Sequence, residues 1–257
     1  MLERFSKSYR VINKEKFVEK LINFSMNQDY FILLNSNNNS DKYDLLCGYG
    51  VKSFIKSSEN SLTKLDNFFE LKKDWLFGYM TYDLRNEIEV LNDDNIDFIN
   101  MPNLYFFQPK IVWFVKGKNV TGLSFEKDLI DNDWKKFNEI SEKEKTENSN
   151  IVKLNLRNSK SEYINKVNKI KERIFRGDCY EMNFCFDLFS EYDEINPYDT
   201  YVKLNNYTKS PMSSFLKAND FFLISSSPER FLSKNGEDII SQPIKGTAKR
   251  GDTPEED

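Results

Sequence analysis

Large apolar residues recur at helical spacing in several stretches of this chain. The pattern predicts helices over residues 13–24, 61–73, 159–176 and 196–205, and a short acidic helix over 85–91. Ser159 and Glu162 form a capping box at the start of the third helix, and Ser61 is expected to cap the second. We expect these two helices to turn their apolar side chains inward, namely Leu62, Leu65, Phe68, Phe69, Ile164, Val167, Ile170 and Ile174.

Apolar runs and alternating residues between these helices predict strands. The strands cover residues 30–34, 43–48, 51–55, 75–82, 104–107, 111–115, 120–125, 151–156, 180–188, 210–216 and 221–225. Gly78 interrupts the fourth strand and indicates that a neighbouring element approaches closely. Alternation is strictest over 180–188, where Asn183 belongs to the polar face. We expect a strand there with one face on a core and the other on water or a polar ligand.

A hairpin is predicted around Asn235-Gly236, because both central residues of a type I′ turn need positive φ. A two-residue loop at this point would pair Ser233 with Asp238. Further along the arms, it would pair Glu229 with Gln242.

The same hairpin brings an acid and an amine to one end. Glu229 lies on the first arm and Lys245 follows the second, where Pro243 and Gly246 bend the chain out of regular pairing. The two groups would lie on the order of 10 Å apart along the strands, at ~3.4 Å per residue. That spacing suits two groups acting on opposite sides of one small substrate. The alternative is a pair of solvated surface charges.

Composition narrows the classes of protein that fit. The 257 residues are 39% hydrophobic and 30% charged, with a net charge of −4 and no basic block that could follow phosphates. The three cysteines fit reduced thiols, no apolar run reaches the length of a membrane span, and the N-terminus lacks a signal-peptide core. We expect a cytoplasmic protein that binds neither nucleic acid nor membranes. Because the chain has no histidine, its chemistry must use carboxylates, lysine or a metal held by oxygen.

Residues 139–150 are charged and poor in large apolar residues, which is typical of a linker. On this basis the chain divides into an N-terminal region, 1–140, and a second region, 151–257. The alternative is an exposed excursion within one domain.

Several strings resemble the chorismate-utilising enzymes, the family of anthranilate synthase component I and aminodeoxychorismate synthase component I. They are SPERFL at 227–232, PIKGT at 243–247, GDCYEMN at 177–183 and WLFGYMTYDLRNEIEVL at 75–91. The resemblance implies an α+β fold, anthranilate-synthase-component-I-like, with mostly antiparallel sheets packed with helices. Lys245 in PIKGT is typical of aminodeoxychorismate synthases, whereas anthranilate synthases typically have alanine there.

The resemblance also implies an activity: the synthase component of 4-amino-4-deoxychorismate formation from chorismate and glutamine-derived ammonia, in 4-aminobenzoate and folate biosynthesis. Lys245 and Glu229 would be catalytic, and Asn183, Gly246 and Thr247 would bind substrate. The implied partners are chorismate and a glutamine amidotransferase subunit, and the implied cofactor is Mg²⁺. Family members continue beyond the point where this chain stops, and that C-terminal part carries the Mg²⁺ ligands. We therefore expect an incomplete C-terminus, no metal site in this chain, and no turnover by these 257 residues alone.

A binding role for L-tryptophan is an alternative. The string LLNS at 33–36 resembles the family's tryptophan-binding string, and a Pro-Met pair resembles the opposite wall of that site. Leu34, Ser36, Pro211 and Met212 would then contact tryptophan; the simpler interpretation is a strand that ends in a polar loop. The remaining alternatives are anthranilate synthase component I and a non-catalytic fragment that binds tryptophan or a glutaminase subunit.

Overall fold

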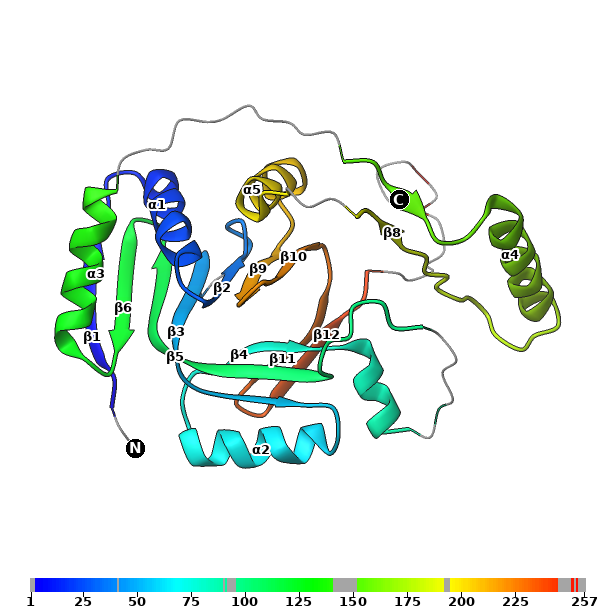
Figure 1. Cartoon of the computed structure of the whole chain (residues 1–257), viewed down its shortest axis with the longest axis horizontal. Helices are drawn as coiled ribbons and strands as arrows, with labels where there is room; N and C mark the ends of the chain where they lie inside the picture. Colours follow the sequence, from blue (N-terminus) through cyan, green and yellow to red (C-terminus); the bar gives the residue numbers. More distant parts are fainter. Residues whose placement is uncertain are drawn as a thin grey trace. The chain divides into compact units, whose positions relative to one another are not determined.

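A computed structural model describes residues 3–40, 42–89, 91, 96–140, 152–191, 195–244, 251 and 253. The chain divides into two compact units. The larger unit comprises Met1–Lys143 and Pro197–Asp257, and the smaller comprises Glu144–Asn196. Figure 1 shows the helices and strands of each unit. No helix in these described ranges is long and apolar enough to cross a membrane.

An eight-stranded sheet forms the centre of the larger unit. Its strands in spatial order are β1 (Phe5–Arg10), β6 (Asn119–Ser124), β5 (Leu104–Lys116), β3 (Leu45–Ser57), β2 (Tyr30–Asn35), β9 (Met212–Ala218) and β10 (Phe221–Ser227). The eighth strand, β4 (Phe77–Met80), pairs with the first half of β5. Every pairing in this sheet is antiparallel, which confirms the expected α+β class with mostly antiparallel strands.

Three helices share a buried core with one face of this sheet: α1 (Lys14–Met26), α3 (Lys127–Glu139) and α5 (Pro197–Thr208). The largest side chains of that core are Trp113, Tyr201, Phe31, Phe137 and Phe215. α1 begins where the pattern predicts, because the Asn13 side chain accepts a hydrogen bond from the Lys16 backbone nitrogen at 2.9 Å. Successive side chains of a strand point to opposite faces of the sheet, so the residues that alternate with those of the first core form a second core on the other face. This second core is made of Ile32, Leu46, Phe77, Tyr105, Phe107, Val112 and Leu216.

Two pairs of predicted strands are single long strands in the structure. The predicted break before residue 51 lies inside β3, where Gly50 adopts a φ of +67° and the register shifts between Val51 and Ser53. β5 likewise runs through Pro109, which lies opposite Val51. A bulge lets a strand bend without ending, so glycine and proline here mark a bend and not a loop.

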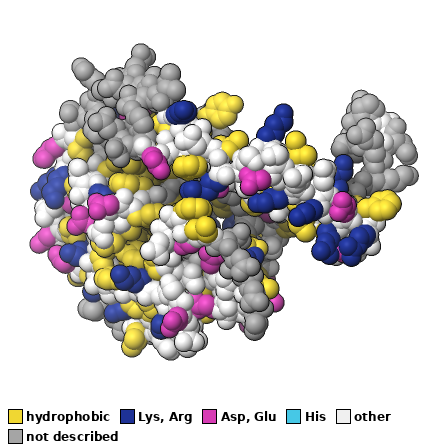
Figure 2. All heavy atoms as spheres, turned by 45° about the vertical axis from the view of Figure 1, so that its right-hand side comes forward, with side chains coloured by type: hydrophobic (Ala, Val, Ile, Leu, Met, Phe, Trp, Pro, Cys, Tyr) yellow, Lys and Arg dark blue, Asp and Glu magenta, His cyan; other side chains and the backbone are white. Residues whose placement is uncertain are grey.

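The second predicted helix is present as α2 (Ser61–Lys72), but its start and its inner face differ from the prediction. Asn60 is the N-cap, and the Ser61 nitrogen and hydroxyl both donate to the Glu87 carboxylate at 2.6 Å. Leu62 and Phe69 are 43% and 47% exposed, because α2 packs mainly against β3 and β5 and leaves these side chains outside that contact. Hydrophobic side chains also reach the surface at several places on the face drawn in Figure 2.

β4 lies too close to β5 for a side chain at Gly78. A Cβ there would lie 1.8 Å from the Tyr105 carbonyl oxygen, which confirms the predicted close approach. The acidic segment after β4 forms a 3-10 helix, η1 (Tyr82–Glu87), so the predicted short helix is present but begins and ends earlier than residues 85–91.

The smaller unit contains α4 (Lys160–Phe175) and a pair of two-residue strands, β7 (Asn155–Leu156) and β8 (Leu188–Phe189). Both hydrogen bonds of the capping box between Ser159 and Glu162 are present, which confirms that prediction. No residue of α4 is buried, and Ile164 is 45% exposed, so the predicted inward face of this helix is wrong.

The predicted strand over 180–188 is also wrong, because residues 181–187 have no regular structure. The alternating pattern describes where side chains point, but a strand also needs a partner for its N–H and C=O groups. Within the predicted strand, which the structure describes in full, Leu188 pairs with another strand, and residues 181–187 pair with none. The apolar residues before it contact α4 instead: the Tyr163 ring lies 5.5 Å from that of Phe184 and 5.6 Å from that of Phe186.

Strands from both predicted regions, 1–140 and 151–257, share the large sheet, since β9 and β10 follow β2 in its order. Residues 141–150, most of the predicted linker, lie outside the described residues. The division of the chain into these two regions stays a prediction.

Candidate functional site

The hairpin at the end of the larger unit is formed by β11 (Arg230–Asn235) and β12 (Asp238–Gln242). Its presence confirms the prediction, but its register does not. Asn235 pairs with Asp238 and Ser233 with Ile240, so the predicted partners of Ser233 and Glu229 are wrong. The reason lies in the turn: Gly236 has a φ of +62° while Asn235 does not enter the positive-φ region. A glycine at the first central position is typical of a type II′ turn, which centres the loop one residue later than a type I′ turn at Asn-Gly.

Glu229 lies at the open end of this hairpin. The Ser227 hydroxyl donates to the Glu229 carbonyl oxygen at 3.1 Å and accepts from the Glu229 nitrogen at 3.3 Å, which fixes the backbone that carries the carboxylate. Across the arms, Arg230 Nε donates to Gln242 Oε1 at 2.9 Å. The Glu229 side chain itself is exposed to solvent.

The described structure does not test whether the other residues predicted to act on substrate lie near Glu229. Lys245, Gly246 and Thr247 lie outside the described residues. Asn183 belongs to the smaller unit, where it is exposed in the irregular segment. The predicted roles of these residues stay predictions.

The four residues predicted to bind tryptophan do come together at one end of the β2–β9 pair. β2 and β9 are antiparallel, with Leu34 opposite Ser214. Met212 lies two residues before Ser214, so Leu34 and Met212 belong to the same face of the sheet, and Ser36 directly follows the last residue of β2. Pro211 directly precedes β9.

Ser36 is 8% exposed and closes the loop that follows β2. Its backbone nitrogen donates to the Asp44 carbonyl oxygen at 2.9 Å, and its hydroxyl lies 3.2 Å and 3.1 Å from the carbonyl oxygens of Tyr43 and Asp44. The hydroxyl proton is therefore used within the loop. Its oxygen can still accept a hydrogen bond from an ammonium or indole N–H group.

If these residues bind tryptophan, L-tryptophan should give a measurable heat of binding in calorimetry. Ser36→Ala should weaken that binding about tenfold, because one hydrogen bond contributes about 1–1.5 kcal/mol. Ser8→Ala removes a hydroxyl from β1 and should leave the affinity unchanged. Folded protein that gives no heat with tryptophan, or an affinity that Ser36→Ala does not change, would remove the tryptophan interpretation.

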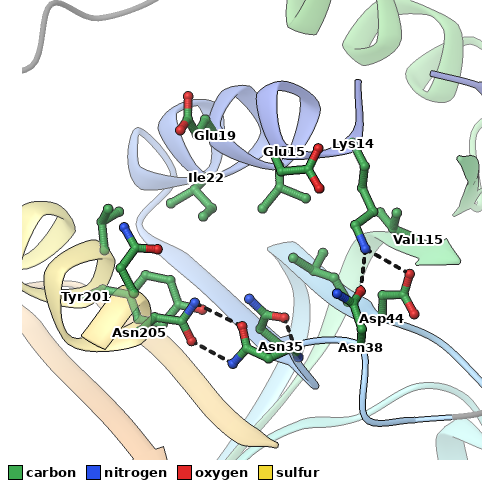
Figure 3. Close-up of a pocket in the computed structure, with 15 residues that line it drawn as sticks. Lys14, Glu15, Glu19, Ile22, Asn35, Asn38, Asp44, Val115, Tyr201 and Asn205 are labelled. Atoms are coloured by element: carbon green, nitrogen blue, oxygen red, sulfur yellow. Dashed lines mark hydrogen bonds and ion pairs between the residues drawn. The ribbon is translucent and has the colours of Figure 1, made fainter. Parts of the chain in front are cut away.

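A cavity of about 220 Å³ lies between α1, α5 and the adjacent ends of β2, β3 and β5 (Figure 3). At one end, Lys14 Nζ donates to Asp44 Oδ2 at 3.1 Å and to Asn38 Oδ1 at 2.5 Å. At the other end, the Asn37 and Asn205 amides exchange hydrogen bonds of 2.9 and 3.2 Å. No motif marks this cavity in the sequence; the asparagine-rich run at 35–39 is the local signal that accompanies it.

The residues that the structure describes do not form a metal site. Among the residues it describes, no group of three or more cysteine, aspartate or glutamate side chains could hold a metal ion. The Mg²⁺ ion that the resemblance implies stays a prediction.

The antiparallel α+β fold and the strings around Glu229 and Lys245 define the class of protein. Residues 25–257 match the family described as chorismate binding enzyme, which is most of the chain. The chain belongs to the chorismate binding enzyme family, and this confirms the resemblance found in its sequence.

The curated proteins that are similar to this chain carry two related names. The chain is 27% identical to aminodeoxychorismate synthase component 1 of Bacillus subtilis over 203 residues, which are 70% of this chain and 41% of that protein. It is 31% identical to the Escherichia coli protein of the same name over 99 residues, 38% of this chain and 22% of that protein. It is 28% identical to anthranilate synthase component 1 of Lactococcus lactis over 193 residues, 70% of this chain and 42% of that protein. The matches thus span less than half the length of these relatives.

Among solved structures, the menaquinone-specific isochorismate synthase MenF from Escherichia coli aligns with a TM-score of 0.49 and 10% sequence identity. The alignment covers 90% of this chain and 52% of that one.

Proposed function

We propose that this chain is part of an enzyme that forms 4-amino-4-deoxychorismate from chorismate and ammonia. The observation that carries the proposal is Lys245, the residue of the PIKGT string that is typical of aminodeoxychorismate synthases. Relatives with both names, aminodeoxychorismate synthase and anthranilate synthase, are similar to this chain. Lys245 is therefore the reason for proposing 4-amino-4-deoxychorismate, and not anthranilate, as the product.

In the proposed reaction, the neutral Lys245 amine attacks C2 of chorismate, both ring double bonds shift, and the C4 hydroxyl leaves. Glu229 donates the proton with which that hydroxyl departs as water. Ammonia then adds at C4, both double bonds shift back, and the bond between C2 and the Lys245 nitrogen breaks. Glu229 takes up the proton that the added ammonia loses, and so returns to its starting state.

Both residues need a particular environment for these roles. A lysine amine is almost wholly protonated at neutral pH, since its ordinary pKa is about 10.4, so burial or a nearby cation must favour its neutral form. A carboxyl group that donates a proton at neutral pH must be shielded from water. Because Glu229 is exposed in this structure, the proposal requires substrate or further protein to cover it during the reaction.

Two further parts of the proposal concern partners. A glutamine amidotransferase subunit would supply the ammonia, and Mg²⁺ bound elsewhere in the full-length protein would offset the charge of the chorismate carboxylate. A second candidate function, tryptophan binding, is supported by the juxtaposition of Leu34, Ser36, Pro211 and Met212 at the β2–β9 pair.

Product analysis of the full-length protein tests the proposal. With chorismate, ammonium and Mg²⁺, we expect 4-amino-4-deoxychorismate, identified by chromatography and by its conversion to 4-aminobenzoate with an added lyase. Formation of anthranilate would show instead that the second family activity is correct. Protein that is folded but leaves chorismate unchanged under these conditions would overturn the enzymatic proposal.

A further inference from the structure

The lining of the cavity between α1 and α5 does not include Leu34, Ser36, Pro211 or Met212. The cavity lies on the face of the sheet that α1 and α5 cover, and Asn35 of β2 contributes to its lining. Leu34 is next to Asn35 in β2, and Met212 is next to Ser213, the partner of Asn35 in β9, so the side chains of Leu34 and Met212 point to the other face of the sheet. With a volume of about 220 Å³, the cavity is smaller than the roughly 300–1,000 Å³ of pockets for drug-sized ligands, so it suits a ligand the size of an amino acid.

At one end of the cavity, the Lys14 ammonium is paired with a buried carboxylate. Asp44 is only 7% exposed and is shared by two ammonium groups, Lys14 Nζ at 3.1 Å and Lys116 Nζ at 3.2 Å, of which Lys14 lines the cavity. Burial by itself raises the pKa of Asp44, but hydrogen bonds from the Gly117 nitrogen, Lys14 and Lys116 outweigh it and hold the pKa below its usual value. Lys14 Nζ also donates to Asn38 Oδ1, so it keeps one N–H group that can donate to the carboxylate of a ligand.

Negative charge stands beside it on α1. Glu15 follows Lys14 in the first turn of the helix, lines the same cavity and is exposed. Figure 3 shows the Glu15 carboxylate on the side of α1 where Lys14 lies. In the described part of the chain, no ion pair neutralises Glu15 or Glu19, which also lines the cavity. A cationic and an anionic side chain at one end match the adjacent carboxylate and ammonium groups of a free amino acid.

The rest of the cavity is suited to an apolar side chain. Val18 and Ile22 of α1 and Tyr201 of α5 line it, and Figure 3 shows Ile22 directed below the helix toward the strands. The amides of Asn37 and Asn205 already satisfy each other through their two hydrogen bonds, so they do not require a polar partner from a ligand.

We propose that this cavity binds a free aliphatic α-amino acid, with the carboxylate at Lys14, the ammonium group at Glu15 and the side chain against Val18 and Ile22. This site is independent of the chorismate chemistry proposed above and of the residues predicted to bind tryptophan.

Calorimetry on the full chain with L-leucine as the probe tests the proposal. We expect saturable binding that is at least tenfold weaker with leucinol, which lacks the carboxylate, and with 4-methylpentanoate, which lacks the ammonium group. Glu15→Gln and Lys14→Met should each weaken leucine binding at least tenfold. The matched controls Glu126→Gln and Lys118→Met remove the same charges at exposed positions outside the cavity lining and should have no effect.

Three results would overturn the proposal. The first is the absence of leucine binding to folded protein at millimolar concentration. The second is binding that neither Glu15→Gln nor Lys14→Met weakens. The third is leucine binding that L-tryptophan displaces and Ser36→Ala abolishes, which would place the ligand at the β2–β9 pair. Because Glu15 is exposed, Glu15→Gln should fold normally, and a thermal melt of each variant verifies this.

Discussion

Lys245→Ala is expected to lower the formation of 4-amino-4-deoxychorismate at least about 100-fold in the full-length enzyme supplied with ammonia. If the Lys245 nitrogen bonds to C2 of chorismate, its removal leaves C2 open to ammonia, so residual turnover should shift toward anthranilate. The measurement is the ratio of the two products by chromatography at saturating ammonium. Lys234→Ala removes an exposed lysine from β11 of the same hairpin and should leave both the rate and the product unchanged.

A second variant separates covalent catalysis from an electrostatic role. Lys245→Arg keeps the positive charge but presents a guanidinium that stays protonated and is a poor nucleophile. If Lys245 acts as a nucleophile, Lys245→Arg should be as inactive as Lys245→Ala. Near-normal formation of 4-amino-4-deoxychorismate by either variant would contradict a covalent role for Lys245.

Asp74→Asn is expected to lower the free energy of unfolding by about 3 kcal/mol. Arg4 Nε and Nη2 bind the two Asp74 carboxylate oxygens at 2.8 and 2.7 Å, and Gln108 Nε2 donates to the same carboxylate at 2.7 Å. The Arg4 and Asp74 side chains are only 7% and 13% exposed. An amide at position 74 would turn an N–H group toward one of these donors and leave the Arg4 charge without its partner.

This ion pair joins distant parts of the larger unit. Arg4 Nη2 also donates to the Pro109 carbonyl oxygen at 2.7 Å. Arg4, which directly precedes β1, therefore binds both β5 through Pro109 and the segment before β4 through Asp74. Urea unfolding followed by tryptophan fluorescence measures the loss. Asp66→Asn, an exposed change on α2, serves as the control and should shift the midpoint little. Equal stability of the Asp74→Asn protein and the unmodified protein would show that the pair contributes no net stability.

The Asp74 contribution should also depend on pH. Burial by itself raises the pKa of Asp74, but hydrogen bonds from Arg4, Gln108 and the Trp75 backbone outweigh it and hold the pKa below its usual value. A carboxyl whose pKa is lowered in the folded state stabilises the fold above its unfolded pKa, about 3.9 for aspartate, and loses that contribution as the pH falls through the folded pKa. The difference between Asp74→Asn and the unmodified protein should therefore be constant near neutral pH and shrink below about pH 4.

Local signals in the sequence predict local structure well in this protein. Ser159 and Glu162 form the expected capping box of α4, because a cap needs only side chains and backbone within one turn. Gly78 marks a close contact because the residue that must be small is itself in the sequence. The short strings around Glu229 and Lys245 indicate the family for a similar reason, since each string is a run of neighbouring residues.

Features that depend on distant partners were decided by the tertiary structure. Segment 180–188 alternates like a strand but remains irregular over residues 181–187, because no described strand pairs with its backbone there. β3 and β5 are continuous because each supplies the other with hydrogen bonds on both sides of the bend at Val51 and Pro109. Ser61 is expected to cap α2 from its sequence, yet Glu87 binds it from 26 residues away.

By itself, the sequence determined the capping box of α4, the antiparallel α+β class, the hairpin and the family, since each follows from neighbouring residues or from a short string. Only the tertiary structure decided the register of that hairpin, because the backbone angle of Gly236 is set in three dimensions. It also decided which side of α2 is buried and which charges surround the cavity. Lys14, Asp44 and Asn205 lie far apart along the chain, and only the packing of α1 and α5 on one face of the sheet brings them to one place.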